Sequence, residues 1–299
     1  MTKTTKAWLT AAAVLTITGL LLFAAGMTVH GWDFSRLDTA EYETKHFVIV
    51  EPFSGISADI GDADLILAPA EDGTCGVLCR TQKGTSCIAE VRDHTLYVTR
   101  SDSRAWYDAI QIAVNEPQIT LFLPQNEYES LTVRGTSADV EIPNGFSFRN
   151  ADVAVTTGDI RVMGVTAETA ELSVTTGKVS VTDTDCVGTL AIHVTTGGTE
   201  LRGVTCGDLV SDGSTGDAVL DNVKASGRIT VERSTGDVSL ISSDAAEIAV
   251  TTGTGNVTGS LLSEKTYITH SGTGGVDVPA SQSGGRCTVT TGTGNIRFQ

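Results

Sequence analysis

Acidic and amide side chains recur at one position of this 299-residue sequence, directly after a Thr-Gly step. They are Asp159, Asp217, Asp237, Asn256 and Asn295. A column of carboxylates on stacked repeats could bind calcium, and an acid pair such as Asp217 and Asp237 could hydrolyse a glycosidic bond. Lys178, Gly198 and Gly275 interrupt the column, and Asx turns explain the same residues without a ligand. We therefore predict neither a metal site nor a catalytic site here.

Two of the six cysteines offer redox chemistry. Cys186 and Cys206 each lie nine residues after the glycine of a Thr-Gly step, so they fall in one column on adjacent repeats. Alanines occupy the same position in other repeats, which indicates a cramped site for small side chains. The two cysteines are therefore either a pair of buried thiols or a disulfide.

The remaining cysteines do not form a metal-binding pattern. Cys75 and Cys79 share one face of a predicted strand but lie too far apart along it to pair with each other, whereas either could reach Cys87. The three have no histidine nearby and their spacing is not that of a zinc site. Cys287 lies alone near the end of the chain.

Threonine hydroxyls are a third candidate. A threonine directly follows a valine of the repeat at Thr156, Thr175, Thr195, Thr251 and Thr290. These hydroxyls could form a ladder that binds glycans, or they could reflect strand propensity and contact with solvent. The five histidines are scattered, and neither a nucleophile elbow nor a phosphate-binding glycine loop occurs, so we expect no enzyme activity and no cofactor.

The element that must position these side chains is a repeat of 19 or 20 residues. Its Thr-Gly steps end at Gly158, Gly177, Gly197, Gly216, Gly236, Gly255, Gly274 and Gly294. Apolar residues alternate with polar ones on both sides of each step, which predicts two short strands. The alternation changes parity at the step, so we expect the chain to bend at each of these glycine corners.

A unit this short cannot bury its apolar face alone. Stacking at about 4.8 Å with parallel pairing closes a continuous core and predicts an all-β parallel β-solenoid, a single-stranded β-helix of 19–20-residue rungs. We expect the valines of the repeat to stack inward, at Val155, Val174, Val194, Val231 and Val250.

The N-terminus predicts a membrane anchor. Residues 7–29 form an uncharged, largely apolar run long enough to span a bilayer. Lys3 and Lys6 precede this run and acidic residues follow it, so the positive-inside rule places the tail 1–6 in the cytoplasm and the bulk of the chain outside as a single-pass protein. The alternative is a cleaved signal peptide.

The rest of the chain divides into three parts. Residues 30–45 read as a stalk, residues 46–131 as an irregular β-rich cap, and residues 132–299 as the solenoid repeats. The last repeat, Val289–Phe298, has nothing after it to cover its apolar end. We therefore predict that this C-terminal rung is an exposed edge through which the protein could self-associate.

These features resemble a known family. The anchor followed by Gly31–Phe34, the strand end at Leu123-Pro124 before Tyr128 and Leu131–Val133, and the serial glycine corners are similar to the bacterial putative-adhesin family of envelope-anchored β-solenoid domains. The resemblance covers nearly the whole chain. It implies a parallel β-solenoid on the cell envelope and transfers no catalytic residue.

Charge and composition favour a non-enzymatic surface protein. The net charge of −16, without a cluster of basic residues, excludes nucleic acid as a partner. We expect an envelope protein for adhesion or surface interaction, with the membrane and a protein or glycan ligand as partners. The alternatives are an accessory or sensing ectodomain that acts through a membrane partner in an envelope-stress system, and a carbohydrate-active β-helix enzyme.

Overall fold

The computed structural model describes residues 3–29, 31–32, 41–71, 73–102, 116–280 and 283–299. These residues form one helix, α1 (Lys3–Val29), and 24 strands. The chain divides into two compact units, residues 1–42 with 104–116, which include the helix, and residues 43–103 with 117–299, which include the solenoid. Residues 30 and 33–40 of the predicted stalk, and residues 1–2 of the predicted tail, lie outside the described residues.

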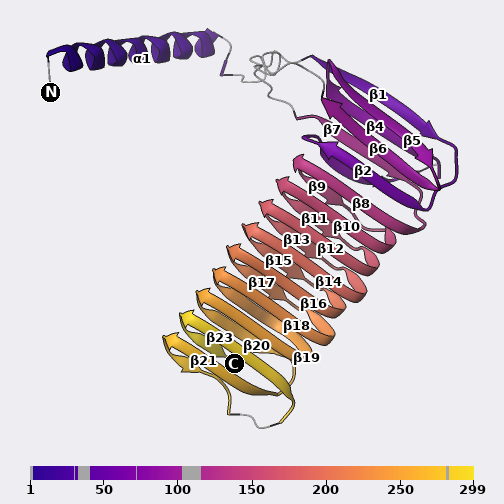
Figure 1. Ribbon diagram of the computed structural model, residues 1–299, viewed down its shortest axis with the longest axis vertical. Helices are drawn as coiled ribbons and strands as arrows, with labels where there is room; N and C mark the ends of the chain where they lie inside the picture. Colours follow the sequence, from indigo (N-terminus) through magenta and orange to yellow (C-terminus); the bar gives the residue numbers. More distant parts are fainter. Residues whose placement is uncertain (1–2, 30, 33–40, 72, 103–115, 281–282) are drawn as a thin grey trace. The chain divides into compact units, whose positions relative to one another are not determined.

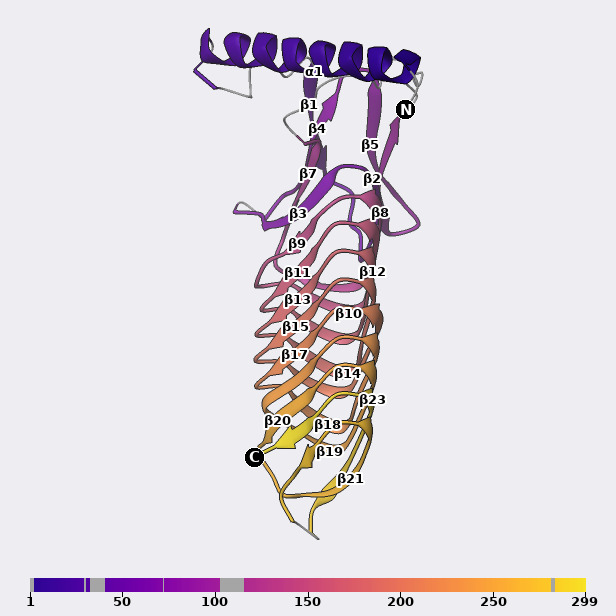
Figure 2. The ribbon, with the colours of Figure 1, turned by 90° about the vertical axis from the view of Figure 1, so that its left-hand side faces the viewer.

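Each regular rung consists of a long strand, a glycine corner, a short strand and a second turn. β10 (Ser147–Thr157) leads through one such corner into β11 (Ile160–Met163). The next rung repeats this, with β12 (Thr166–Thr176) parallel to β10 and β13 (Val179–Thr182) parallel to β11. The structure therefore confirms the predicted parallel β-solenoid. Figures 1 and 2 show the stacked rungs, with long strands on one face and short strands on the other.

The two faces are continuous from rung to rung. In spatial order the long-strand face consists of β6 (Thr95–Asp102), β2 (Gly55–Gly61), β8 (Glu127–Ser137), β10, β12, β14 (Asp185–Thr196), β16 (Thr205–Thr215), β18 (Lys224–Thr235), β19 (Val238–Thr254), β23 (Gly285–Thr293) and β21 (Lys265–Thr273). The short-strand face consists of β7 (Gln118–Leu123), β3 (Asp64–Pro69), β9 (Val140–Ile142), β11, β13, β15 (Thr199–Arg202), β17 (Ala218–Asp221), the start of β19, β20 (Val257–Leu261), β24 (Ile296–Phe298) and β22 (Val276–Asp277).

The inward-facing valines are buried as predicted, but they form two columns and not one. Val155, Val174 and Val194 are register partners on successive rungs. Val231 and Val250 belong to the neighbouring column, which also contains Ile192. The reason is their distance from the corner: the first three lie three residues before the glycine and the other two lie five residues before it.

At the C-terminal end the order of the rungs departs from the order of the sequence. β23 pairs with β19 on one side and with β21 on the other, and β24 likewise lies between β20 and β22. The prediction that Val289–Phe298 is the exposed edge is therefore wrong. The last residues of the chain insert one rung inward, and the outermost rung is Lys265–Asp277 (Figure 1).

The N-terminal end shows the same inversion. β2 and β3 stack directly on β8 and β9, whereas the later strands β6 and β7 lie outside them. β4 (Cys75–Gln82) and β5 (Thr85–Arg92) then pair antiparallel with β7 and β6, and β1 (Tyr42–Ile49) pairs with β4. The antiparallel strands end the parallel stack on this side.

Candidate functional site

The glycine corners are the positions at which the backbone tolerates no side chain. All eight glycines have φ between 126° and 155°. A β-carbon on Gly197, for example, would lie 1.8 Å from the carbonyl oxygen of Gly177 on the preceding rung. The corners are therefore packed backbone against backbone, and their role is to let the rungs stack.

The corner acids are bound to the backbone. Asp159 Oδ1 accepts a hydrogen bond of 2.9 Å from the N–H of Lys178, one rung further on. Asp217 Oδ1 accepts one of 2.8 Å from the N–H of Asp237, whose own Oδ1 accepts one of 2.7 Å from Asn256. Within the described residues no group of three histidine, cysteine, aspartate or glutamate side chains could hold a metal ion. These side chains stabilise the stack.

The threonine ladder divides into two parts. Thr156, Thr175 and Thr195 line a groove of about 300 Å³ along the corner, beside Arg134. Thr251 and Thr290 pair with each other in a different column, in register with Glu232. A second groove, of about 410 Å³, contains Thr195 and Thr251 together with Asp212 and Glu232. The hydroxyl surface is thus shorter than predicted and has acids at one end.

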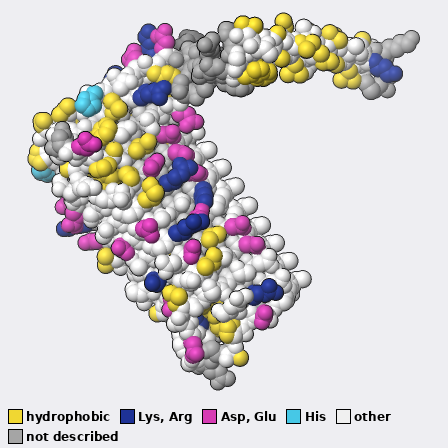
Figure 3. All heavy atoms as spheres, turned by 180° about the vertical axis from the view of Figure 1, so that it is seen from behind, with side chains coloured by type: hydrophobic (Ala, Val, Ile, Leu, Met, Phe, Trp, Pro, Cys, Tyr) yellow, Lys and Arg dark blue, Asp and Glu magenta, His cyan; other side chains and the backbone are white. Residues whose placement is uncertain are grey.

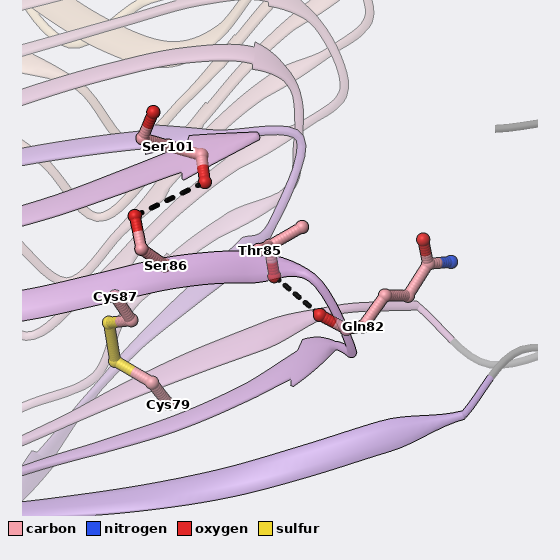
Figure 4. The surroundings of a disulfide bond; sticks show 6 residues. All are labelled: Cys79, Gln82, Thr85, Ser86, Cys87 and Ser101. Atoms are coloured by element: carbon pink, nitrogen blue, oxygen red, sulfur yellow. Dashed lines mark hydrogen bonds between the residues drawn. A yellow bond between two sulfur atoms is a disulfide. The ribbon is translucent and has the colours of Figure 1, made fainter. Parts of the chain in front are cut away.

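A disulfide links the two faces at the capped end. Cys79 of β4 is bonded to Cys87 of β5, with 6.5 Å between their Cα atoms (Figure 4). The sequence left Cys75 and Cys79 as alternative partners, and the structure selects Cys79. Cys75 is a buried free thiol, and burial raises its pKa to about 11.

Cys186 and Cys206 are register partners on β14 and β16. Both are buried free thiols. Burial raises the pKa of Cys206 to about 12, with Cys186 and Asp208 as smaller causes, and burial also raises the pKa of Cys186. Because the thiolate is the nucleophilic form, these thiols are poorly suited to covalent chemistry at neutral pH.

Arg233 lies inside the solenoid, and sequence reasoning missed it. Only 4% of its surface is exposed. Nη2 donates to Thr199 Oγ1 and to Ser211 Oγ, both at 2.9 Å, and Nη1 donates to the carbonyl oxygens of Ser211 and Glu232. Nε has no hydrogen-bond partner. Burial lowers the pKa of Arg233, and Asp212 opposes that shift.

A pocket of about 440 Å³ opens in the β-rich cap. Its wall is mainly apolar, with Val48 of β1 and Phe122 of β7 as its larger apolar residues. His46, Glu71 and Thr74 supply its polar groups. The combination is typical of a site for a small amphipathic molecule.

Exposed charges on the solenoid form ion pairs between adjacent rungs. Arg134 binds Asp152, and Arg228 binds Glu247. Figure 3 shows basic and acidic side chains beside one another on one face of the molecule. These pairs tie adjacent rungs together at the surface, while the chain as a whole keeps its net charge of −16.

The helix is a separate candidate site. Residues Thr4–Val29 of α1 are long and apolar enough to cross a membrane, as an anchor or as a signal sequence. Nearly all of their side chains are exposed, including Trp8 and Leu15.

A protein-family model described as Toastrack DUF4097 matches residues 55–298. A comparison with curated proteins finds no match. Among solved structures, one described as a "putative lipid binding protein" from Parabacteroides distasonis is 13% identical, covers 88% of this chain and 98% of its own, and has a TM-score of 0.55. At this identity the likeness extends to the fold.

Two structures described as putative adhesins are also similar. The one from Bacteroides fragilis is 14% identical, with 87% of this chain and 97% of that chain covered and a TM-score of 0.42. The one from Parabacteroides distasonis is 10% identical, with 88% and 98% covered and a TM-score of 0.46.

Proposed function

The chain belongs to the Toastrack DUF4097 family, and from that premise we propose that it is a non-enzymatic surface protein whose solenoid contacts partners outside the cell. The observation that carries the proposal is that the corner aspartates form hydrogen bonds with the backbone of the next rung. They accept backbone N–H groups along the stack, so the residues that could have served catalysis stabilise the solenoid. The grooves along the corners remain as the surface for a ligand.

We infer that α1 anchors this solenoid in the cell membrane, with the N-terminus in the cytoplasm. Lys3 and Lys6 lie at the start of α1, before its apolar run, and basic residues stay on the cytoplasmic side. Protease added to intact cells that express the full chain should digest the residues beyond Trp32. Digestion only after lysis would show that the topology is wrong.

Adhesion itself is tested with the anchored full chain. Cells that display it should bind to a glycan array, or to a second cell type, more strongly than cells that display the same helix fused to an unrelated domain. The matched variant is Thr175→Glu, which places a charge in the centre of the threonine groove. If the display has no effect on binding, the adhesive function is wrong. If cells that display the chain bind more strongly, but Thr175→Glu does not reduce that binding, the groove is not the contact surface.

The cap pocket favours a second candidate, the binding of a lipid acyl chain. Its apolar wall supports this, and a structural neighbour is described as lipid-binding. A fluorescent fatty acid should bind the full chain, and Val48→Glu should abolish that binding. Val50→Glu is the matched control, because Val50 is exposed close by and does not line the pocket. Equal loss in both variants would contradict a pocket site.

A further inference from the structure

The outermost rung at the end of the solenoid opposite the β-rich cap has a neighbouring rung on only one of its sides. In the part of the chain that the structure describes, β21 pairs with β23 alone and β22 pairs with β24 alone. The other edge of each strand presents backbone N–H and C=O groups without a neighbouring strand. Such an edge is a template for pairing with another strand.

This edge lacks the usual protection against pairing. β21 contains no proline, and its one lysine does not place a charge at the edge that would prevent pairing with another strand. Lys265 is 3% exposed, and its Nζ lies 2.6 Å from Asp244 Oδ1 and 2.6 Å from Ser263 Oγ. The lysine therefore turns inward toward β19, where it pairs with Asp244. Burial raises the pKa of Asp244, but the hydrogen bonds from Lys265, Ser263 and the Ala245 N–H, together with the positive charge of Lys265, lower it overall.

Exposed apolar side chains gather on the same rung and on the turn that leads into it. Leu262, Ile268 and Val276 are 54%, 53% and 46% exposed. Between residues 117 and 261, a far longer stretch, the exposed large apolar side chains are Met163, Val187 and Ile241. Tyr267 packs on Phe298 and closes the end of the core beneath this edge.

The distribution of charge along the chain favours a second copy as the partner of this edge. The chain carries a net −16, so two copies repel each other along their lengths. Residues 262–299 are the exception, with three basic residues (Lys265, Arg286, Arg297) and two acidic ones (Glu264, Asp277). The outward side chains of β21 are Thr266, Ile268 and His270, so an antiparallel pair of two such strands sets no acidic groups against one another.

We propose that the β21 edges of two copies pair antiparallel about a twofold axis and form a dimer tip to tip. The pairing extends the long-strand face of one copy into that of the other, and it buries Ile268 of each against its partner. This self-association goes beyond the proposed adhesive function and does not depend on it, because it is measured on the purified protein.

Sedimentation of the full chain in detergent micelles tests the proposal. The wild type should dimerise reversibly, and Ile268→Lys should weaken dimerisation at least tenfold. Thr288→Lys is the matched control, since Thr288 is the register partner of Ile268 one rung inward and also faces outward. A wild type that stays monomeric at about 100 µM, no effect of Ile268→Lys, or an equal effect of Thr288→Lys would each overturn the proposal.

Hydrogen exchange on the unaltered protein gives a second readout that does not rely on a variant folding correctly. Amides of β21 should become more protected as the protein concentration rises. Amides of β5, an edge strand at the other end of the same face, should not change. Concentration-independent exchange in β21, or equal protection of β5, would contradict the tip-to-tip dimer.

Discussion

One inward-facing column changes character along the solenoid. In the earlier rungs it consists of Val155, Val174 and Val194, and in the later rungs the same column continues as Gly213, Arg233, Thr252 and Thr291. Both halves keep the same rung spacing and the same corners. The comparison teaches that the backbone ladder fixes the repeat, while the interior accepts polar side chains when most of their donors and acceptors are hydrogen-bonded.

The later half satisfies its polar groups through the corners. Thr252 Oγ1 donates to the carbonyl oxygen of Gly236 at 3.1 Å, and Thr291 Oγ1 donates to that of Gly255 at 2.9 Å. Gly213 has no side chain, and a β-carbon there would lie 2.4 Å from the carbonyl oxygen of Val194 and 3.3 Å from Nη1 of Arg233. The glycine is therefore required first by the backbone of the preceding rung, and it also leaves room for the guanidinium of the next.

The largest effect is expected in the apolar half. Val174→Asp places a carboxylate where its neighbours are valines, and an unpaired buried charge costs about 3–5 kcal/mol of unfolding free energy. Thr252→Val, the opposite change in the polar half, removes one hydrogen bond and should cost about 1 kcal/mol. Denaturant unfolding of both variants checks this. Equal costs would mean that the two halves do not differ.

The buried arginine is the next test. Arg233→Ala should cost about 2–4 kcal/mol, because it leaves a cavity and removes the donors to Thr199 and Ser211. Arg233→Met fills the same space without the charge and should lie within about 1 kcal/mol of the wild type. If the methionine variant is as unstable as the alanine variant, the hydrogen bonds and not the packing carry the effect.

The comparison also marks what sequence can predict. The spacing of the eight corner glycines is enough to predict the fold, because each rung needs a residue that adopts positive φ at its corner. Arg233 could have been found by the same parity, since Val231-Glu232-Arg233 places the arginine on the inward side. The valines alone do not separate the two inward columns, because the columns differ only in their distance from the corner glycine, three residues or five.

The order of the terminal rungs could not be predicted in this way. Residues 251–257 and 290–296 are nearly the same sequence, Thr-Thr-Gly-Thr-Gly-Asn followed by valine or isoleucine, and residues 271–276 are a third version. Each can stack on the others, so periodicity does not say which rung lies outside. The distal edge therefore emerged only from the strand pairing.

A smaller effect concerns the thiols of the middle rungs. Because burial raises the pKa of Cys206 to about 12, we expect Cys186 and Cys206 to stay protonated and unreactive toward maleimide at pH 8 in the native protein. Both should react after unfolding in denaturant, whereas Cys79 and Cys87 should react only after reduction. Mass spectrometry of labelled peptides gives the answer. A Cys186–Cys206 disulfide in the isolated protein would contradict the expectation.

The smallest expected effect is that of the surface ion pair between Glu200 and Lys178, which should depend on pH in a way that the buried Arg233 does not. The hydrogen bond from Lys178, together with the nearby Arg202, lowers the pKa of Glu200 from its ordinary value of 4.5 in spite of partial burial. A lowered folded-state pKa adds stability above the unfolded-state value and loses it as the pH falls through the folded-state pKa. Glu200→Gln should therefore cost about 0.2–1 kcal/mol at pH 7, as is usual for surface pairs, and the difference should fade below about pH 4. Arg233→Met should show no such dependence in this range, because a guanidinium stays protonated throughout it. If the cost of Glu200→Gln is the same at pH 3 and pH 7, the pairing with Lys178 does not stabilise the fold.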